Sequence, residues 1–241
     1  MKKKKMARAR LNLYQSMLIF LLALASITGA TYAWFTLSSS VRLHNMTLNI
    51  IDNDALRIDI QAHEQIEQYF QELDGNVVLE ASASKELYPV SSTDGTNFYD
   101  EDGTFNTDTV NTYLEVPLHF MSTRDMYVHL SGKGQSESGE GTNVSGTQGV
   151  EQALRISFTA DGTTKIYEPY GASWGTFSLE GVQSYREDDT LFFIEKEKDK
   201  TVIMRVWIEG TDPQCTDELR KALYEIELYF AGTDENNIPY E

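Results

Sequence analysis

The chain has 241 residues and a formal net charge of −17 at neutral pH. Its first 33 residues contain six basic and no acidic side chains, so the remainder carries 14 Lys and Arg against 37 Asp and Glu. Such an excess of negative charge argues against a nucleic-acid partner and against binding to anionic lipid. The remainder is long enough for one β domain or two small ones.

The N-terminal stretch joins a basic segment to an apolar segment and then to small residues. Basic side chains crowd residues 2–10, and an apolar run follows that is densest over 17–25. This order is typical of a secretory signal peptide, whose positive end stays in the cytoplasm. Thr31 and Ala33 are the small residues that a signal peptidase needs before its cut. We therefore expect cleavage between Ala33 and Trp34 during export.

An uncleaved membrane anchor is the alternative reading of the same stretch. From Met17 to Phe35 it approaches the roughly 20 residues that a spanning helix needs, and residues 13–33 would then hold the protein in the membrane. Under both readings the rest of the chain works outside the cytoplasm, either secreted or at the cell surface.

Apolar residues alternate with polar ones along most of the remaining chain, which predicts β-strands. The predicted strands cover 46–50, 56–60, 114–120, 126–130, 154–158, 165–167, 191–194, 202–208 and 224–230. Asp-Gly pairs that begin at 74, 94, 102 and 161 supply turns, the last of them joining a hairpin. The pattern favours a mainly β fold, an antiparallel jelly-roll-like β-sandwich with one or two short helices.

Local features refine this prediction. Asp52–Asp54 reads as a hairpin or corner, and Pro117 places its strand at a sheet edge or a bulge. Helical spacing of apolar residues predicts a helix from His63 to Leu73, ended by Asp74-Gly75. A helical turn is an alternative over 217–223.

The organisation that follows has four parts. A leader (1–33) precedes an N-terminal arm (34–43) and a sandwich domain (44–233), and a polar tail (234–241) follows. Within the domain, 131–149 consists almost wholly of small and polar residues, which indicates a flexible surface loop.

The junction Gly29–Thr36 resembles that of the TasA/camelysin family of Gram-positive bacteria, which are exported β-sandwich proteins with leaders cut by a dedicated signal peptidase. Thr47–Ile50 lies at about the family's spacing from it. The stretch Val206–Thr216 is also similar to uncharacterised clostridial exported proteins. The resemblance implies a jelly-roll subunit that assembles into biofilm-matrix fibres.

Assembly of that kind would proceed by donor-strand exchange. The freed N-terminal segment of one subunit enters the sheet of the next, and such head-to-tail contacts propagate as a filament. The donor residues here would be Trp34, Phe35, Leu37, Val41 and Leu43. Alternatively, the arm packs under its own sandwich, or Trp34 and Phe35 sit in the membrane interface if the leader is uncut.

Camelysin-like proteins have been classed as metallopeptidases, so zinc ligation is a further hypothesis. His63 begins a sequence like that of a zinc-binding helix, but Glu67 stands where the second His is needed. His119 and His129 are predicted on adjacent strands, where they would be neighbours across the ladder. A chance pairing of surface histidines explains that placement equally well.

Calcium has a weak candidate site in the acidic stretch that contains Asp100, Asp102, Asn106 and Asp108. Their oxygen atoms are suitable ligands, but the spacing is not that of a helix-loop-helix site. A solvated acidic loop is the alternative, and we expect no cofactor.

Cys215 is the single cysteine, so it cannot form an internal disulfide. It follows Asp212-Pro213-Gln214, which predicts a turn, and a buried filler is a more typical role than a reactive thiol.

The sequence thus favours a non-enzymatic exported protein of the cell surface or biofilm matrix, a homo-oligomer or filament built by N-terminal strand donation. A membrane-tethered extracellular binding domain that does not polymerise is the first alternative. An extracellular metallopeptidase is the second.

Overall fold

The computed structural model describes residues 15–20, 40–51, 54–81, 86–106 and 111–240. The chain divides into two compact units, Met1–Ser38 and Ser39–Glu241. In the first unit, residues 15–20 are helical. None of the helices within the described ranges combines the length and apolar character needed to cross a membrane. The expected cleavage junction, Thr31–Trp34, lies outside the described residues.

The second unit is mainly β, with few and short helices. Its strands are β1 (Val41–Ile50), β2 (Leu56–Asp59), β3 (Glu72–Leu73), β4 (Glu86–Leu87), β5 (Leu114–Ser122), β6 (Met126–Leu130), β7 (Asn143–Gly146), β8 (Leu154–Ala160), β9 (Thr163–Tyr167), β10 (Phe192–Ile194), β11 (Lys200–Ile208) and β12 (Leu223–Thr233). The helical pieces are α2 (Gly75–Ala81), α3 (Val150–Ala153), η1 (Ile66–Gln68), η2 (Glu187–Asp189) and η3 (Asp217–Leu219).

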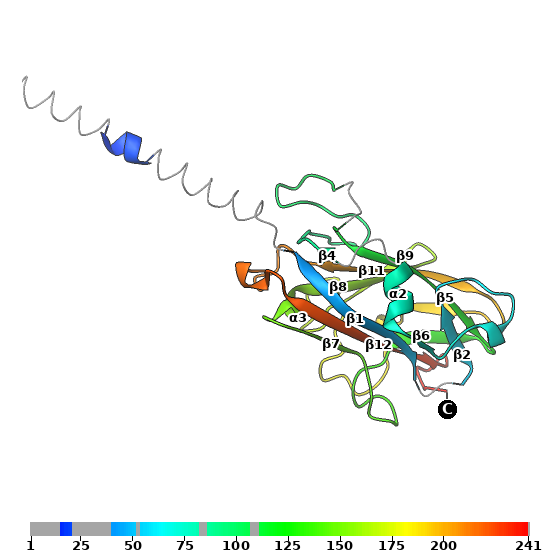
Figure 1. The fold of residues 1–241 in the computed structure, drawn as a ribbon. Coiled ribbons are helices and arrows are strands. Elements are labelled where there is room, and N and C mark those ends of the chain that lie inside the picture. Colours follow the sequence, from blue (N-terminus) through cyan, green and yellow to red (C-terminus); the bar gives the residue numbers. More distant parts are fainter. Residues whose placement is uncertain (1–14, 21–39, 52–53, 82–85, 107–110, 241) are drawn as a thin grey trace, which may run out of the picture. The chain divides into compact units, whose positions relative to one another are not determined.

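The strands form two sheets (Figure 1). A seven-stranded sheet has the order β10-β6-β12-β1-β3, with β4 also beside β1 and β7 also beside β12. A five-stranded sheet has the order β2-β5-β11-β8-β9. Phe230 of the larger sheet meets Phe120 and Phe158 of the smaller one, with ring centroids 5.2 and 5.8 Å apart. The two sheets therefore share one core, as in a β-sandwich.

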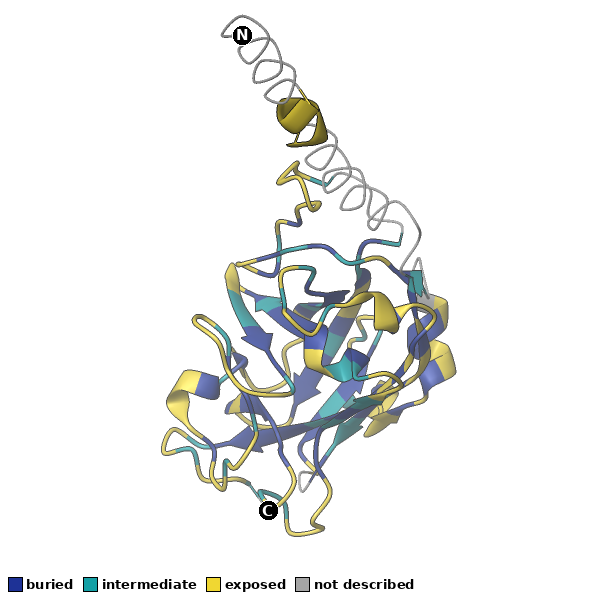
Figure 2. Ribbon diagram, turned by 90° about the vertical axis from the view of Figure 1, so that its left-hand side faces the viewer, coloured by how far each residue is buried: buried dark blue, intermediate teal, exposed yellow. Residues whose placement is uncertain are grey.

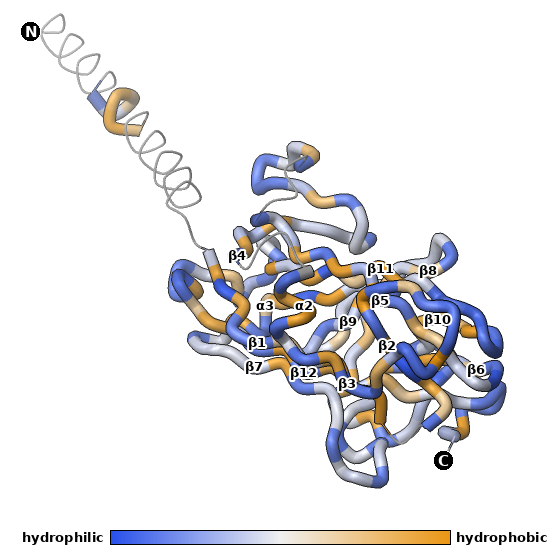
Figure 3. The backbone as a smooth tube through the Cα atoms, turned by 45° about the vertical axis from the view of Figure 1, so that its right-hand side comes forward, coloured by the Kyte–Doolittle hydropathy of each residue, from blue (hydrophilic) through white to orange (hydrophobic). Residues whose placement is uncertain are grey.

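The predicted alternation is confirmed in the strands that form this core. In β5, Leu114, Val116, Leu118 and Phe120 are buried, and the residues between them are more exposed. Figure 2 shows buried strands beneath exposed loops, and Figure 3 shows apolar residues concentrated along the strands. The Asp161-Gly162 hairpin between β8 and β9 is also confirmed, since both residues adopt positive φ angles of 49° and 77°.

A second, smaller core covers the other face of the five-stranded sheet. It consists of Val90, Phe98, Ile166 and Trp207, with Tyr113 packed against it. Phe98 stacks on Tyr113 at 4.2 Å and meets Trp207 edge-on at 5.4 Å. β8 of this sheet is covered on both faces, since all of its residues except Thr159 are buried.

The helix predicted from His63 to Leu73 is wrong. That stretch contains η1 and then β3, and the helix α2 begins after it. Asp74 explains the difference, because its carboxylate accepts the Asn76 N–H at 2.8 Å and its carbonyl accepts the Val77 N–H at 3.0 Å. Asp74-Gly75 therefore starts a helix and does not end one.

The predicted position of Pro117 also needs correction, because its strand has partners on both sides. β5 lies between β2 and β11, and Pro117 itself pairs with Ile203 of β11. The register with β2, however, stops at His119. At Pro117 the strand thus has a ladder partner on one side only, which is where a residue without an N–H is tolerated.

Three other segments complete the comparison with the predictions. β1 and β2 belong to different sheets, which fits the corner and excludes the hairpin that were the two alternatives around Asp52–Asp54; Asp52 and Asn53 themselves lie outside the described residues. β7 lies inside the stretch expected to be a flexible loop, 131–149, and pairs with β12. In the tail, Pro239 bridges back to Thr233.

Candidate functional site

β1, the first described strand of the second unit (Ser39–Glu241), lies inside the larger sheet and is not at its margin. It runs parallel to β12, from Arg42 beside Leu223 to Ile50 beside Phe230, with an irregularity at His44 (Figure 1). The side chains of Val41, Met46 and Leu48 are completely buried. β1 therefore contributes both ladder hydrogen bonds and apolar side chains to the core.

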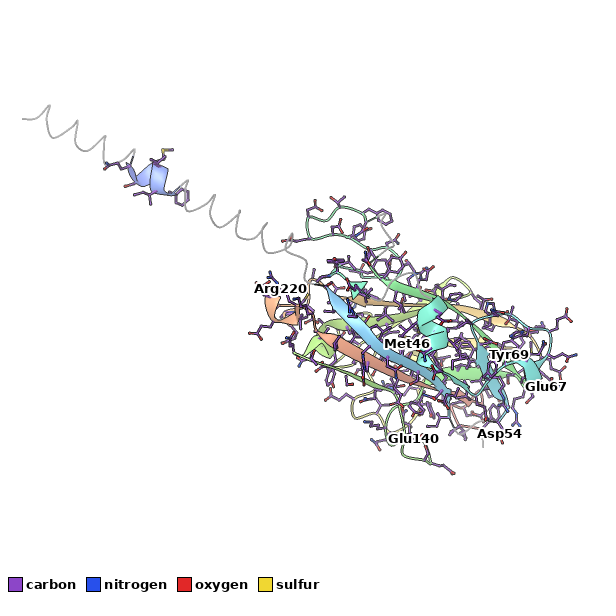
Figure 4. The ribbon with its side chains drawn as sticks, in the orientation of Figure 1. Met46, Asp54, Glu67, Tyr69, Glu140 and Arg220 are labelled. Carbon is purple, nitrogen blue, oxygen red and sulfur yellow. The ribbon has the colours of Figure 1, made fainter. Side chains whose placement is uncertain are left out.

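The other flank of β1 is covered by short pieces of chain. β3 pairs with Leu48 and Asn49, and β4 pairs with Val41 and Arg42. Between these short ladders α2 lies against the strand. A Cβ on Gly75 would collide with the Asn45 side chain and lie 2.7 Å from the Met46 carbonyl oxygen. Figure 4 labels Met46 beneath this helix.

The proposed donor residues divide between described and undescribed parts of the chain. Val41 and Leu43 lie in β1, where their side chains are buried in the domain's own core. Trp34, Phe35 and Leu37 lie outside the described residues. Over its last three residues, 41–43, the arm thus lies in a strand of its own sandwich.

The predicted pairing of His119 with His129 is wrong. β5 carries His119 in the smaller sheet, whereas β6 carries His129 in the larger sheet. His129 is buried, and its Nε2 lies 3.1 Å from Thr233 Oγ1. Burial lowers the pKa of His129 to about 4, and the nearby positive charge of Lys165 adds to the effect.

His63 belongs to a polar network and not to a zinc-binding helix. Its Nε2 lies 2.7 Å from Asp59 Oδ2, and its backbone N–H donates to Tyr69 Oη. Tyr69 is labelled in Figure 4. Tyr69 donates to Asp199 at 2.8 Å, and Asp199 contacts His119 Nδ1 at 2.9 Å. Burial raises the pKa of Tyr69 to about 12, supported by its hydrogen bond to Asp199.

That network holds loops together and offers no metal-binding geometry. His63 precedes η1, so it shares no helical face with Glu67. Across the described part of the chain, no three or more His, Cys, Asp or Glu side chains are grouped so that they could hold a metal ion.

The acidic stretch suggested for calcium uses its oxygen atoms for its own hydrogen bonds. Asn106 donates to Asp100 Oδ1 at 2.6 Å, and the Thr104 N–H donates to Asp102 Oδ1 at 2.8 Å. Hydrogen bonds from the side chain and the backbone of Thr104 lower the pKa of the Asp102 carboxyl. Asp108 lies outside the described residues.

A charged cavity of about 430 Å³ opens on the outer face of the five-stranded sheet, and the sequence alone did not indicate it. Arg155 of β8 stands in it with its side chain 7% exposed. Its guanidinium pairs with Glu168 at 2.9 Å and with Asp212 at 2.5 Å. Arg155 also donates to the carbonyls of Gln152 and Leu154 at 2.9 Å.

Glu209 adds a third carboxylate to the cavity. It accepts hydrogen bonds from the Ser92 N–H, from Trp207 Nε1 and from both the N–H and the hydroxyl of Thr211. One arginine thus faces three carboxylates, and the cavity carries an excess of two negative charges.

Trp174 lies at this cavity with its side chain fully exposed to solvent. The loop that carries it is held by Glu168, whose Oε2 accepts the Ser173 N–H at 3.1 Å and the Ser173 and Thr176 hydroxyls at 2.8 Å. The signal that could have found the site is Arg155, a charged residue in an apolar strand. By default, however, that position is a solvated outer face.

Cys215 lies at the predicted turn, where its N–H donates to the Asp212 carbonyl at 2.9 Å. Its side chain packs against the main core. Burial raises the pKa of its thiol to about 11, and the negative charges of Asp212 and Glu209 add to this. The thiolate is the reactive form, so this cysteine is a packing residue in neutral solution.

These features define a class, a mainly β protein with two sheets, an N-terminal strand inside the larger sheet and a charged cavity on the smaller one. Comparison with known proteins finds no matching family model, no matching curated protein and no matching solved structure.

Proposed function

We propose that the chain is an exported structural protein of the cell surface or biofilm matrix whose jelly-roll-like sandwich associates with other copies by exchanging its first strand. The position of β1 carries this proposal. It is the first strand after the leader, and it lies in the middle of a sheet whose other strands all follow later in the chain.

The connectivity of β1 supports exchange. Its long parallel partner, β12, is the last strand, and its short partners β3 and β4 pair with it over two residues each. Among the described strands no hairpin ties β1 to a neighbour in its own sheet, because the next one, β2, belongs to the other sheet. An identical strand from a second copy would make the same contacts, which is why strand exchange is a low-cost route to association.

The leader and the charge support the location. Basic, apolar and small residues follow one another as a secretory signal requires, and the acidic remainder is suited to a soluble surface. N-terminal sequencing of the exported protein should find Trp34. Finding Met1 instead would favour the membrane-tethered alternative, in which no free arm exists.

Cross-linking between two differently labelled chains tests the exchange itself. Thr47 of β1 is the partner of Glu227 of β12. In a Cys215→Ser background, 34–241 chains with Thr47→Cys are unfolded and refolded together with chains with Glu227→Cys. If β1 of one copy occupies the sheet of another, mild oxidation should give a disulfide-linked heterodimer. Electron microscopy of the unsubstituted 34–241 chain should show filaments.

The matched control uses a pair that exchange of β1 leaves within one chain. Thr159 of β8 and Ile203 of β11 are partners in the smaller sheet. Chains with Thr159→Cys mixed with chains with Ile203→Cys should give no heterodimer above background. Equal yields from the two mixtures, or filaments that persist after deletion of residues 34–50, would rule out strand exchange.

A second candidate function is that of an extracellular binding domain. The observation that favours it is the charged cavity beside Trp174, which contributes nothing to the exchange of β1 because it lies on the smaller sheet.

A further inference from the structure

We propose that the cavity beside Trp174 binds a saccharide that carries protonated amines, an amino sugar. A cavity, a fully exposed indole and a set of hydroxyl groups form the site, and the charge of the cavity selects the ligand. It does not depend on whether the protein forms filaments.

The cavity has the size and lining of a ligand site. Its volume of about 430 Å³ lies within the range of roughly 300–1,000 Å³ that is usual for small-molecule sites. Hydroxyl side chains surround it, contributed by three separate segments: Ser91, Ser92, Thr93, Ser173, Thr176 and Thr211. The hydroxyls of Ser173, Thr176 and Thr211 donate to Glu168 and Glu209, and their oxygens keep lone pairs that can accept from the hydroxyl-rich edge of a sugar.

Trp174 supplies the flat apolar surface that such a ligand needs. Its side chain is fully exposed, although burial of a tryptophan is strongly favourable. The loop that presents it is nevertheless fixed at both sides, because Ser173 and Thr176 bond to the buried carboxylate of Glu168. An indole held on an ordered loop at the mouth of a polar cavity is placed to stack on a sugar ring.

The charges of the cavity exclude anionic ligands and favour cationic ones. Arg155 is already paired with Glu168 and Asp212, so its charge is balanced within the protein and the cavity offers little attraction to a phosphate or a carboxylate. Glu209 has no cationic partner among the described residues and accepts four hydrogen bonds from neutral donors. The excess negative charge would attract an ammonium group, and the indole face adds a cation–π contribution.

A lysine side chain on a protein partner is the competing source of an ammonium group. Its long alkyl stem carries no polar group short of the ammonium. Six of the fourteen residues that line the cavity carry hydroxyl groups, which a lysine stem would leave without a ligand partner and a sugar would engage. The observations therefore favour the sugar.

Binding to four probes tests the proposal on the folded unit, which forms its own core. The probes are the linear tetramer of glucosamine, its fully N-acetylated form, a neutral glucose tetramer and a tetralysine peptide, in mildly acidic buffer where the sugar amines are protonated. Calorimetry and Trp fluorescence should show binding of the glucosamine tetramer, at least about tenfold tighter than each of the others.

Two variants with matched controls locate the binding. Trp174→Ala should weaken it about tenfold, whereas Tyr170→Ala, an exposed aromatic in the same loop that does not line this cavity, should change it less than twofold. Thr93→Lys adds a positive charge at an exposed lining position and should also weaken binding about tenfold. Thr93→Gln is the neutral control of similar size.

Several results would overturn the inference. They are a glucosamine tetramer that does not bind, an N-acetylated or neutral tetramer that binds equally well, a tetralysine peptide that binds as tightly, and unchanged affinity in Trp174→Ala. Both substituted positions are exposed, so circular dichroism should show that the variants keep the native fold.

Discussion

The strand β1 and the cavity beside Trp174 are stabilised by opposite means. β1 is held by apolar side chains and main-chain hydrogen bonds, all of which a second copy of the same strand could reproduce. The cavity is held by the buried ion pairs of Arg155 with Glu168 and Asp212. Each of these charges needs an oppositely charged partner at that place. Interactions of the first kind tolerate exchange, whereas interactions of the second kind fix a surface in one shape.

The largest loss of stability is expected from breaking the buried ion pairs of Arg155. Arg155→Met removes the buried cation that Glu168 and Asp212 share, and it should lower the free energy of unfolding by about 3–5 kcal/mol, since unpaired buried charges are costly. Urea denaturation measures this. Arg220→Met is the control, because its ion pair with Asp217 is at least 41% exposed on both sides and should contribute under about 1 kcal/mol. Equal losses would mean that the buried pairs are no more stabilising than surface pairs.

The next effect comes from the apolar strand. Leu48→Ala creates a cavity beneath β1 and should cost about 3 kcal/mol, because Leu48 is completely buried. Leu223→Ala, on the neighbouring β12, should cost less than about 0.5 kcal/mol because Leu223 is 41% exposed. Measurements at several salt concentrations separate apolar from ionic contributions, since the loss of unfolding free energy in Leu48→Ala should not change with ionic strength. A loss that disappears in high salt would contradict an apolar origin.

A smaller effect separates the two regions by pH. The sheet that contains β1 also buries His129, whose pKa falls from 6.5 to about 4 on folding. The unfolded chain therefore binds a proton that the folded chain does not, so stability is full above pH 6.5 and declines as the pH falls towards 4. Between pH 7 and pH 5 this amounts to about 2 kcal/mol. His129→Asn should remove that part of the slope, and an unchanged slope would assign it to other groups.

The strands were predictable because alternation reports burial on one face, as in β5 and β12. The helix near His63 was not, because Ile66, Phe70 and Leu73 have helical spacing while Asp74 caps a helix that starts later. Local spacing cannot show which of two neighbouring segments a capping carboxylate will serve.

The cavity was out of reach of sequence reasoning for a related reason. Arg155, Glu168 and Asp212 come from three distant segments, and in so acidic a chain any arginine has many apparent partners. Their contact depends on the second small core of Phe98 and Trp207, which covers a face that alternation predicts to be solvated. The exposure of Trp174 depends on a loop fixed by side-chain hydrogen bonds, which no periodicity reports.

The parallel course of β1 and β12 determines where the domain can be extended. Because the first and last strands run in the same direction, Val41 and Thr233 lie at opposite ends of the larger sheet. Most domains have neighbouring termini and tolerate circular permutation. Here a linker would have to run the length of a strand, about 33 Å. A reporter fused after Glu241 would instead follow the end of the sheet at Thr233. The opposite end, where β1 begins at Val41, would stay free.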